Sequence, residues 1–183
     1  MAAANITTSR LQLVPATADD TARLHELLTT EAVRRFLMDD LIVPRDLVAD
    51  RIARSMVLFR DRGVGLWMIY RRSDMAFVGL CGFHRHDGPP TELIYALAAE
   101  YWGQGYASEA AAAAMAHAFN VMAHDEVIAR CDPPNQASEH VMQRIGLRHR
   151  GMTVHEGMLL TVYGLTRQQF MEDRQRQGPE QSV

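Results

Sequence analysis

The sequence contains no lysine, because all 19 of its basic residues are arginine. A Walker-type phosphate loop places a lysine on the β- and γ-phosphates, so the absence of lysine excludes P-loop ATPases and kinases. Pyridoxal enzymes and Schiff-base aldolases form an imine with a lysine amine, and they are excluded for the same reason.

The sequence also has few cysteines, no net positive charge and no long apolar run. Cys81 and Cys131 make no disulfide framework, so we expect a reducing, cytoplasmic setting. The net charge of −3 argues against a nucleic-acid binder, which needs a basic face. The first ten residues lack a basic region followed by an apolar run, and His117, Asn120 and His124 interrupt the alanine-rich stretch. We therefore expect neither a secretory signal nor a membrane span.

The composition that remains is that of one globular domain. Apolar residues make up 48% of the 183 positions and charged residues 22%, and no internal repeat or linker divides the chain. We expect a single domain over residues 1–172, followed by a polar, disordered tail over residues 173–183.

Apolar patterning predicts an α+β fold with about seven strands and about four helices. The turn at Ser73–Asp74 joins two of these strands into an antiparallel hairpin. The predicted strands are Arg10–Ala16, Gly65–Asp74, Ala76–His86, Thr91–Ala98, Glu126–Asp132, Arg148–Glu156 and Gly157–Thr166. The predicted helices are Asp19–Phe36, Arg45–Arg60, an alanine-rich helix that ends near Met122, and Ser138–Arg144.

Two glycines directly precede the alanine-rich helix, in "YWGQGYASEAAAAAMAHAF". The first N–H groups of a helix have no partners within the helix, and the helix dipole leaves that end partly positive. Glycine lets the backbone come close to a phosphate. The pattern therefore predicts a phosphate site at this helix.

A dinucleotide fold is one interpretation of this turn, because a strand, "GQGYAS", a helix and a second strand ending at Asp132 follow one another. Three features argue against it. Ser108 stands where the third glycine belongs, only one strand–helix–strand unit is present, and antiparallel hairpins flank that unit.

Coenzyme A is the other interpretation. The chain resembles the GNAT acyltransferase family, and within it the RimJ/RimL-type ribosomal-protein N-terminal acetyltransferases, from the first strand to "TVYGLTRQQF". The most specific segments are "ELIYALAAEYWGQGYASEA" and "NQASEHVMQRIGL". The family's phosphate turn, Q/R-x-x-G-x-G/A, falls on Trp102–Ala107, with Trp102 in place of arginine or glutamine. The resemblance implies a GNAT fold, whose mixed and mostly antiparallel sheet has parallel, splayed strands 4 and 5.

The resemblance also implies acetyl-CoA as the cosubstrate. Backbone amides of 103–108 would hold the pyrophosphate, and strand-4 backbone groups near Ala96 and Leu97 would pair with pantetheine. Ser108 has an alternative role as a helix N-cap, and Asn135 has one as a turn residue. The predicted cofactor-binding residues are Ala96, Leu97, Trp102, Gly103, Gln104, Gly105, Ala107, Ser108 and Asn135.

The implied reaction is direct attack of a primary amine on the thioester, whose carbonyl oxygen the Leu97 N–H polarises. Glu92 is the predicted general base, with His84, His86 or a water as alternatives, or else it is a solvated edge charge. Most members of the family protonate the thiolate with a tyrosine, where this chain has Met142. Ser138 or a water is therefore the predicted acid, although a serine here also suits a helix N-cap.

The acceptor is left open between a peptide N-terminus, a polyamine and an aminoglycoside. "RRFLMDDLI" falls where the family shapes its acceptor site. We expect no metal site, no nucleic-acid or membrane partner, and leave a homodimer open. Tyr95 and Cys131 are assigned to packing. The alternative function is a non-catalytic acyl-CoA binding or sensing module of the same fold, which the missing tyrosine keeps in view.

Overall fold

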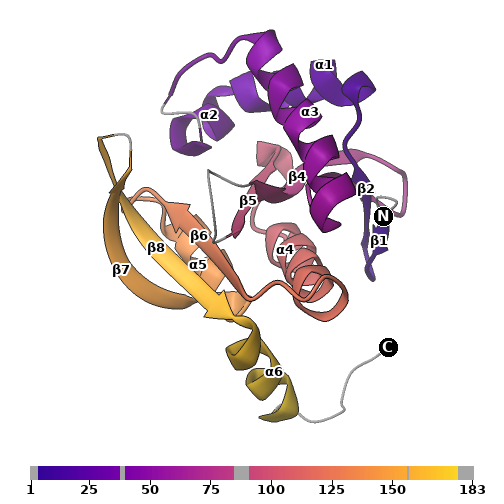
Figure 1. The fold of residues 1–183 in the computed structure, drawn as a ribbon. Helices are drawn as coiled ribbons and strands as arrows, with labels where there is room; N and C mark the ends of the chain where they lie inside the picture. Colours follow the sequence, from indigo (N-terminus) through magenta and orange to yellow (C-terminus); the bar gives the residue numbers. More distant parts are fainter. Residues whose placement is uncertain (1–3, 38–39, 85–90, 156, 177–183) are drawn as a thin grey trace.

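A computed structural model describes residues 4–37, 40–84, 91–155 and 157–176. In these residues eight strands form one sheet, and six helices surround it (Figure 1). The strands are β1 (Ile6–Thr7), β2 (Leu11–Pro15), β3 (Leu66–Arg71), β4 (Phe77–His84), β5 (Thr91–Leu97), β6 (Glu126–Cys131), β7 (Arg148–His155) and β8 (Met158–Thr166). The helices are α1 (Thr21–Thr29), α2 (Glu31–Leu37), α3 (Arg45–Arg62), α4 (Tyr106–Ala116), α5 (Gln136–Arg144) and α6 (Arg167–Arg176).

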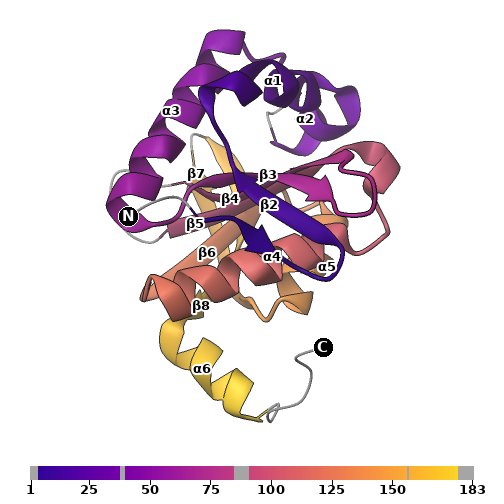
Figure 2. The ribbon, with the colours of Figure 1, turned by 90° about the vertical axis from the view of Figure 1, so that its right-hand side faces the viewer.

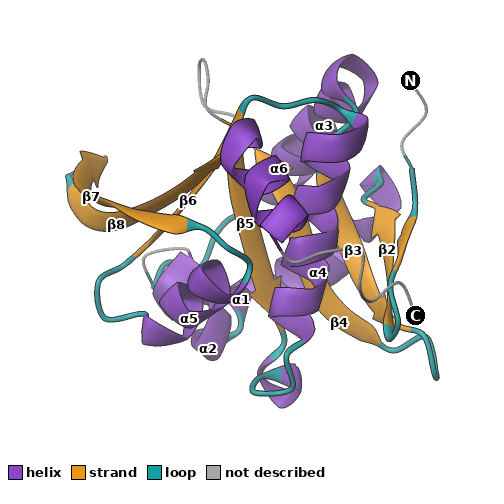
Figure 3. Ribbon diagram, turned by 90° about the horizontal axis from the view of Figure 1, so that it is seen from below, coloured by secondary structure: helices purple, strands orange, loops and turns teal. Residues whose placement is uncertain are grey.

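The sheet has the strand order β1-β2-β3-β4-β5-β6-β8-β7, and only β5 and β6 run parallel. Within the described residues, their pairing joins Thr91 with Val127 and Glu92 with Ile128. Beyond Glu92 the two strands diverge, and β6, β8 and β7 turn away from the rest of the sheet (Figure 3). This arrangement confirms the predicted splay and rules out a doubly wound dinucleotide fold.

Two apolar cores lie on the two faces of the sheet. Helices α1, α2 and α3 cover one face, and α4 and α6 lie on the other (Figure 2). Ala110, Ala111 and Ala114 of α4 are fully buried, because small side chains let this helix pack close to the strands. Trp67 and Phe119 fill the same core, and Phe119 stacks on Phe170 of α6 at 4.8 Å between ring centroids.

Three boundaries differ from the sequence predictions. The helix predicted over 19–36 is split, because Thr30 adopts an extended backbone (ψ 138°) between α1 and α2. The Thr30 hydroxyl donates to the Leu27 carbonyl at 2.7 Å, a local bond that competes with continuing the helix. The tail predicted from residue 173 begins inside α6, which reaches Arg176, while residues 177–183 lie outside the described part of the chain.

The start of α5 is the third difference. The helix begins at Gln136, and Asn135 is its N-cap, with its side-chain oxygen accepting a hydrogen bond from the Ser138 N–H at 3.1 Å. Ser138 is therefore inside the first turn and is not the cap. Likewise the N-cap of α4 is Gly105, so Ser108 does not cap that helix.

Candidate active site

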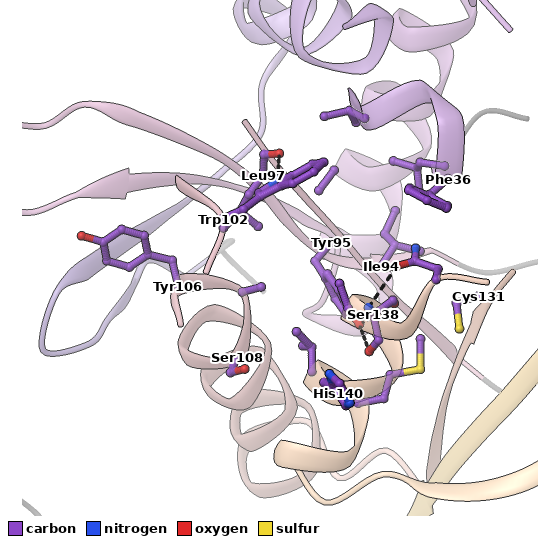
Figure 4. A pocket seen from close by; sticks show the side chains of 18 of the residues that line it. Phe36, Ile94, Tyr95, Leu97, Trp102, Tyr106, Ser108, Cys131, Ser138 and His140 are labelled. Carbon is purple, nitrogen blue, oxygen red and sulfur yellow. Dashed lines mark hydrogen bonds between the residues drawn. The ribbon is translucent and has the colours of Figure 1, made fainter. Parts of the chain in front are cut away.

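A cavity of about 410 Å³ lies where β5 and β6 diverge. Its lining extends from the glycine turn before α4, along β5, to the apolar face of α2 (Figure 4). Figure 4 shows Phe36 of α2 on one side and Tyr106 and Ser108 of α4 on the other, with Tyr95 and Ser138 between them. The break in the sheet therefore opens one continuous site to residues from both of its faces.

The glycine turn is open toward the cavity. Gly103 (φ 72°) and Gly105 (φ 79°) adopt left-handed conformations, which favour glycine. A Cβ on Gly103 would meet no atom within 4 Å, and one on Gly105 only the Arg10 guanidinium at 3.5 Å. Since the turn leads directly into α4, its unpaired amides offer a helix N-terminus to an anion without side chains in between. These residues fit a phosphate group.

Most of the predicted cofactor residues line this cavity. Gln104 is the exception, because it faces a neighbouring hollow on the outer side of the turn, and its amide nitrogen donates to the Glu100 carbonyl at 2.8 Å. The predicted residues that line the cavity are Ala96, Leu97, Trp102, Gly103, Gly105, Ala107, Ser108 and Asn135.

Trp102 fixes the end of β5. Its indole N–H donates to the Leu97 carbonyl at 2.7 Å (Figure 4). The Ala98 N–H donates to Val78 on β4 at 3.0 Å. Because hydrogen-bonding direction alternates along a strand, the Leu97 amide points to the opposite side, where β6 has already diverged. The Leu97 N–H thus faces the splay, as the oxyanion prediction requires.

Ser138 forms a hydroxyl pair with Tyr95. The two side-chain oxygens lie 2.8 Å apart, and the Tyr95 hydroxyl also donates to the Ser138 carbonyl at 3.0 Å. Burial raises the pKa of Tyr95, so its hydroxyl stays protonated at neutral pH. A proton-bearing group therefore stands in the cavity although position 142 is a buried methionine.

Sequence reasoning missed Tyr95, which it assigned to packing. Strand alternation puts Tyr95 on the same face as Leu93 and Leu97, toward the core that contains α4. That alternation was the one available signal. The contact with Ser138, 43 residues away, depends on how α5 packs after β6.

Glu92 is not a solvated edge charge. It is 6% exposed, and Arg130 donates to both of its carboxylate oxygens, with the Nε bond at 2.9 Å. His84 Nε2 lies 3.2 Å from Glu92 Oε2. Burial alone would raise the pKa of Glu92, but the hydrogen bonds and charges of His84 and Arg130 lower it to about 2. A carboxylate held in this way is a weak proton acceptor, so its contacts argue against the predicted role of Glu92 as the base.

His84 is the more accessible member of this cluster. Its side chain is 39% exposed, whereas those of Glu92 and Arg130 are 8% and 12% exposed. Arg130 also lines the cavity and so connects the cluster to it. His86, the other predicted alternative, lies outside the described residues.

Trp102 stands where the family's phosphate turn has an arginine or glutamine, so it supplies no positive charge there. Two arginines nevertheless lie beside the turn. Arg10 is engaged, because its guanidinium contacts Glu109 at 2.6 Å and donates to the Gln104 carbonyl at 3.0 Å. Arg144, at the end of α5, is exposed and lines both the cavity and the outer hollow. It makes no ion pair with any residue that the structure describes. Arg144 is thus a cation that remains available to a ligand phosphate.

The comparison with protein families decides the family of the chain. An acetyltransferase (GNAT) domain model matches residues 10–148. The chain belongs to the GNAT acetyltransferase family. This GNAT protein is an acyltransferase whose cosubstrate is acetyl-CoA.

The curated relatives include a named N-acetyltransferase. The chain is 27% identical over 155 residues to the uncharacterized N-acetyltransferase YnaD of Bacillus subtilis, a match that covers 80% of this chain and 84% of YnaD. It is 34% identical over 90 residues to the uncharacterized protein YkkB of the same organism, covering 48% of this chain and 52% of YkkB.

Solved structures share the fold. The ribosomal L7/L12 α-N-protein acetyltransferase RimL, in complex with coenzyme A, has a TM-score of 0.74 at 20% identity, with 89% of this chain and 98% of RimL covered. The aminoglycoside acetyltransferase AAC(6′)-Ib, also with coenzyme A, has a TM-score of 0.74 at 17% identity, with 90% of this chain and 99% of that one covered.

Two features are absent from the described residues. No group of three or more His, Cys, Asp or Glu side chains in these residues is arranged to hold a metal ion. None of the helices in the same part of the chain has the length and apolar character needed to cross a membrane.

Proposed function

We propose that this GNAT protein transfers the acetyl group of acetyl-CoA to a primary amine by direct attack of the amine on the thioester. The observation that carries the proposal is the continuous cavity between the glycine turn and α2, with the Tyr95–Ser138 hydroxyl pair at its centre. RimL acts on a protein amine and AAC(6′)-Ib on an aminoglycoside, so two neighbours with this fold both act on amines. Acetyl-CoA supplies the activated acetyl group. The residues of this chain hold the coenzyme, stabilise the charge on the carbonyl oxygen and transfer protons.

The coenzyme is held by backbone groups and one side-chain cation. Amides of 103–108 bind the pyrophosphate, and the Asn135 amide group faces pantetheine. Arg144 binds a further phosphate beside the turn. The Leu97 N–H donates to the thioester carbonyl oxygen and stabilises the negative charge that develops there.

Proton transfer uses two pairs of side chains. His84 accepts the amine proton through water, and Glu92 positions its ring, because the ion pair with Arg130 keeps Glu92 ionised and fixed. At the other end, Ser138 donates toward the leaving sulfur. The single Tyr95 hydroxyl proton can go to the Ser138 carbonyl or to the Ser138 Oγ, and when it goes to the Oγ the serine hydroxyl hydrogen is free to point into the cavity.

Two parallel measurements test this function. Release of free coenzyme thiol is followed with a panel of amines and peptides, and acetyl-CoA binding is measured by calorimetry on the same preparation. We expect binding together with amine-dependent thiol release and an acetylated product. Binding without release on every acceptor would support the non-catalytic sensing module instead.

A further inference from the structure

The acceptor end of the cavity has apolar walls. Helix α2 presents Ala32, Val33, Phe36 and Leu37 to it, one face of the helix at i, i+1, i+4 and i+5 spacing. Ile94 of β5 also lines the cavity. Figure 4 shows the Phe36 ring at this end of the site, away from the glycine turn. Such a surface stabilises an apolar group and disfavours a charge that it cannot pair.

Two carboxylates near this end in the described residues are already paired. No carboxylate lines the cavity among the residues that the structure describes. Glu92, which lies behind the wall, is bound by Arg130, and Asp40, which follows α2, pairs with Arg34 at 2.8 Å. Arg35 is exposed, and its guanidinium lies 5.3 Å from the centroid of the Phe36 ring. A second ammonium on the acceptor would meet the Arg35 guanidinium here, and the described residues that line the cavity offer it no carboxylate.

From these contacts we infer that the acceptor is a monoamine whose amine is attached to an apolar group, and that polyamines and aminoglycosides are poor acceptors. This inference rests on the proposed acetyl transfer to amines. The reacting amine loses its proton to the His84 cluster, while the apolar group packs against α2. A like charge placed next to Arg35 is repelled, which adds selectivity against polycations.

The test uses two amines of equal length. In n-hexylamine the chain ends in a methyl group, and in cadaverine it ends in a second ammonium. Thiol release is measured with each, using the full chain and saturating acetyl-CoA. We expect kcat/KM for hexylamine to exceed that for cadaverine at least about tenfold. Equal values, or a preference for cadaverine or an aminoglycoside, would overturn the inference.

A charge reversal at the rim provides a second readout. Arg35→Glu places an exposed carboxylate beside Phe36, and we expect it to raise the cadaverine-to-hexylamine ratio of kcat/KM by about three- to tenfold. The matched control is Arg62→Glu at the far end of α3, which is also exposed and should leave the ratio unchanged. An unchanged ratio in Arg35→Glu would contradict the charge argument.

An amine attached to an apolar group can belong to a small molecule or to a protein N-terminus, and peptides distinguish these two sources. A peptide that begins with leucine is compared with one that begins with lysine. If the acceptor is a protein N-terminus, the leucine peptide must have the higher kcat/KM. If no acceptor releases thiol, the proposed function fails, and the inference is then judged by calorimetric binding of the two amines to the coenzyme-bound protein. Tighter binding of hexylamine supports the inference, and tighter binding of cadaverine refutes it.

Discussion

Replacing Glu92 with glutamine tests the buried ion pair directly. The pKa of Glu92 is lowered from its ordinary 4.5 to about 2, and each pKa unit corresponds to about 1.4 kcal/mol. The ionised carboxylate therefore contributes about 3 kcal/mol to the free energy of unfolding at neutral pH. Removing one partner of a buried pair generally costs about 3–5 kcal/mol, since Arg130 is left without its counter-charge. With a loss of about 3 kcal/mol, the melting temperature of a chain of this size should fall by about 6–12 °C.

The pH dependence gives the sign of the effect. A carboxylate whose pKa is lower in the folded protein stabilises it above the unfolded pKa, and this contribution is lost as the pH falls through the folded pKa. The stability difference between wild type and Glu92→Gln should be full at pH 7 and shrink from about pH 4.5 to about pH 2. Urea unfolding at several pH values measures this difference.

Glu26→Gln is the matched control, because Glu26 is exposed on α1 and should change stability little. A Glu92→Gln protein as stable as wild type at pH 7 would refute the ion pair. A stability difference that did not change with pH would also contradict the reasoning.

The remaining predictions concern the two ends of the cavity. Gly105→Val adds strain at a left-handed position and should weaken acetyl-CoA binding at least about tenfold in calorimetry, with an unchanged circular dichroism spectrum; undiminished affinity would rule out the phosphate cradle. Ser138→Ala and Tyr95→Phe should each lower kcat about tenfold or more with little change in acetyl-CoA affinity, and normal rates in both would remove the hydroxyl pair from the mechanism. Arg144→Gln should weaken acetyl-CoA binding about tenfold, and identical affinities would show that this arginine meets no phosphate. His84→Ala should lower kcat about 10²-fold or more at pH 7, with a smaller loss at higher pH where free amine is available; a pH-independent loss would argue against a base.

The parts of the site that could be predicted from the sequence depend on local signals. Glycines before a helix mark Gly103 and Gly105, because only a few residues decide a left-handed turn at a helix N-terminus. The splay of β5 and β6 was implied by the resemblance to the GNAT family, which rests on "ELIYALAAEYWGQGYASEA" and "NQASEHVMQRIGL". Thr30 was a weaker signal, since a threonine hydroxyl interrupts some helices and not others.

The parts that could not be predicted depend on non-local packing. Glu92, His84 and Arg130 come from three neighbouring strands, and their contacts require the register of β4, β5 and β6. Alternation places a side chain on a face but does not show what lies opposite. The same holds for Tyr95, whose hydroxyl meets Ser138 only through the packing of α5.

A crystal structure of the protein with coenzyme A tests the central claim most directly. We predict that the pyrophosphate lies within hydrogen-bond distance of the amides of 103–108 and that pantetheine runs along the Leu97 end of β5. The sulfur is predicted beside the Tyr95–Ser138 pair. A coenzyme bound elsewhere, or one whose sulfur points away from this pair, would contradict the account.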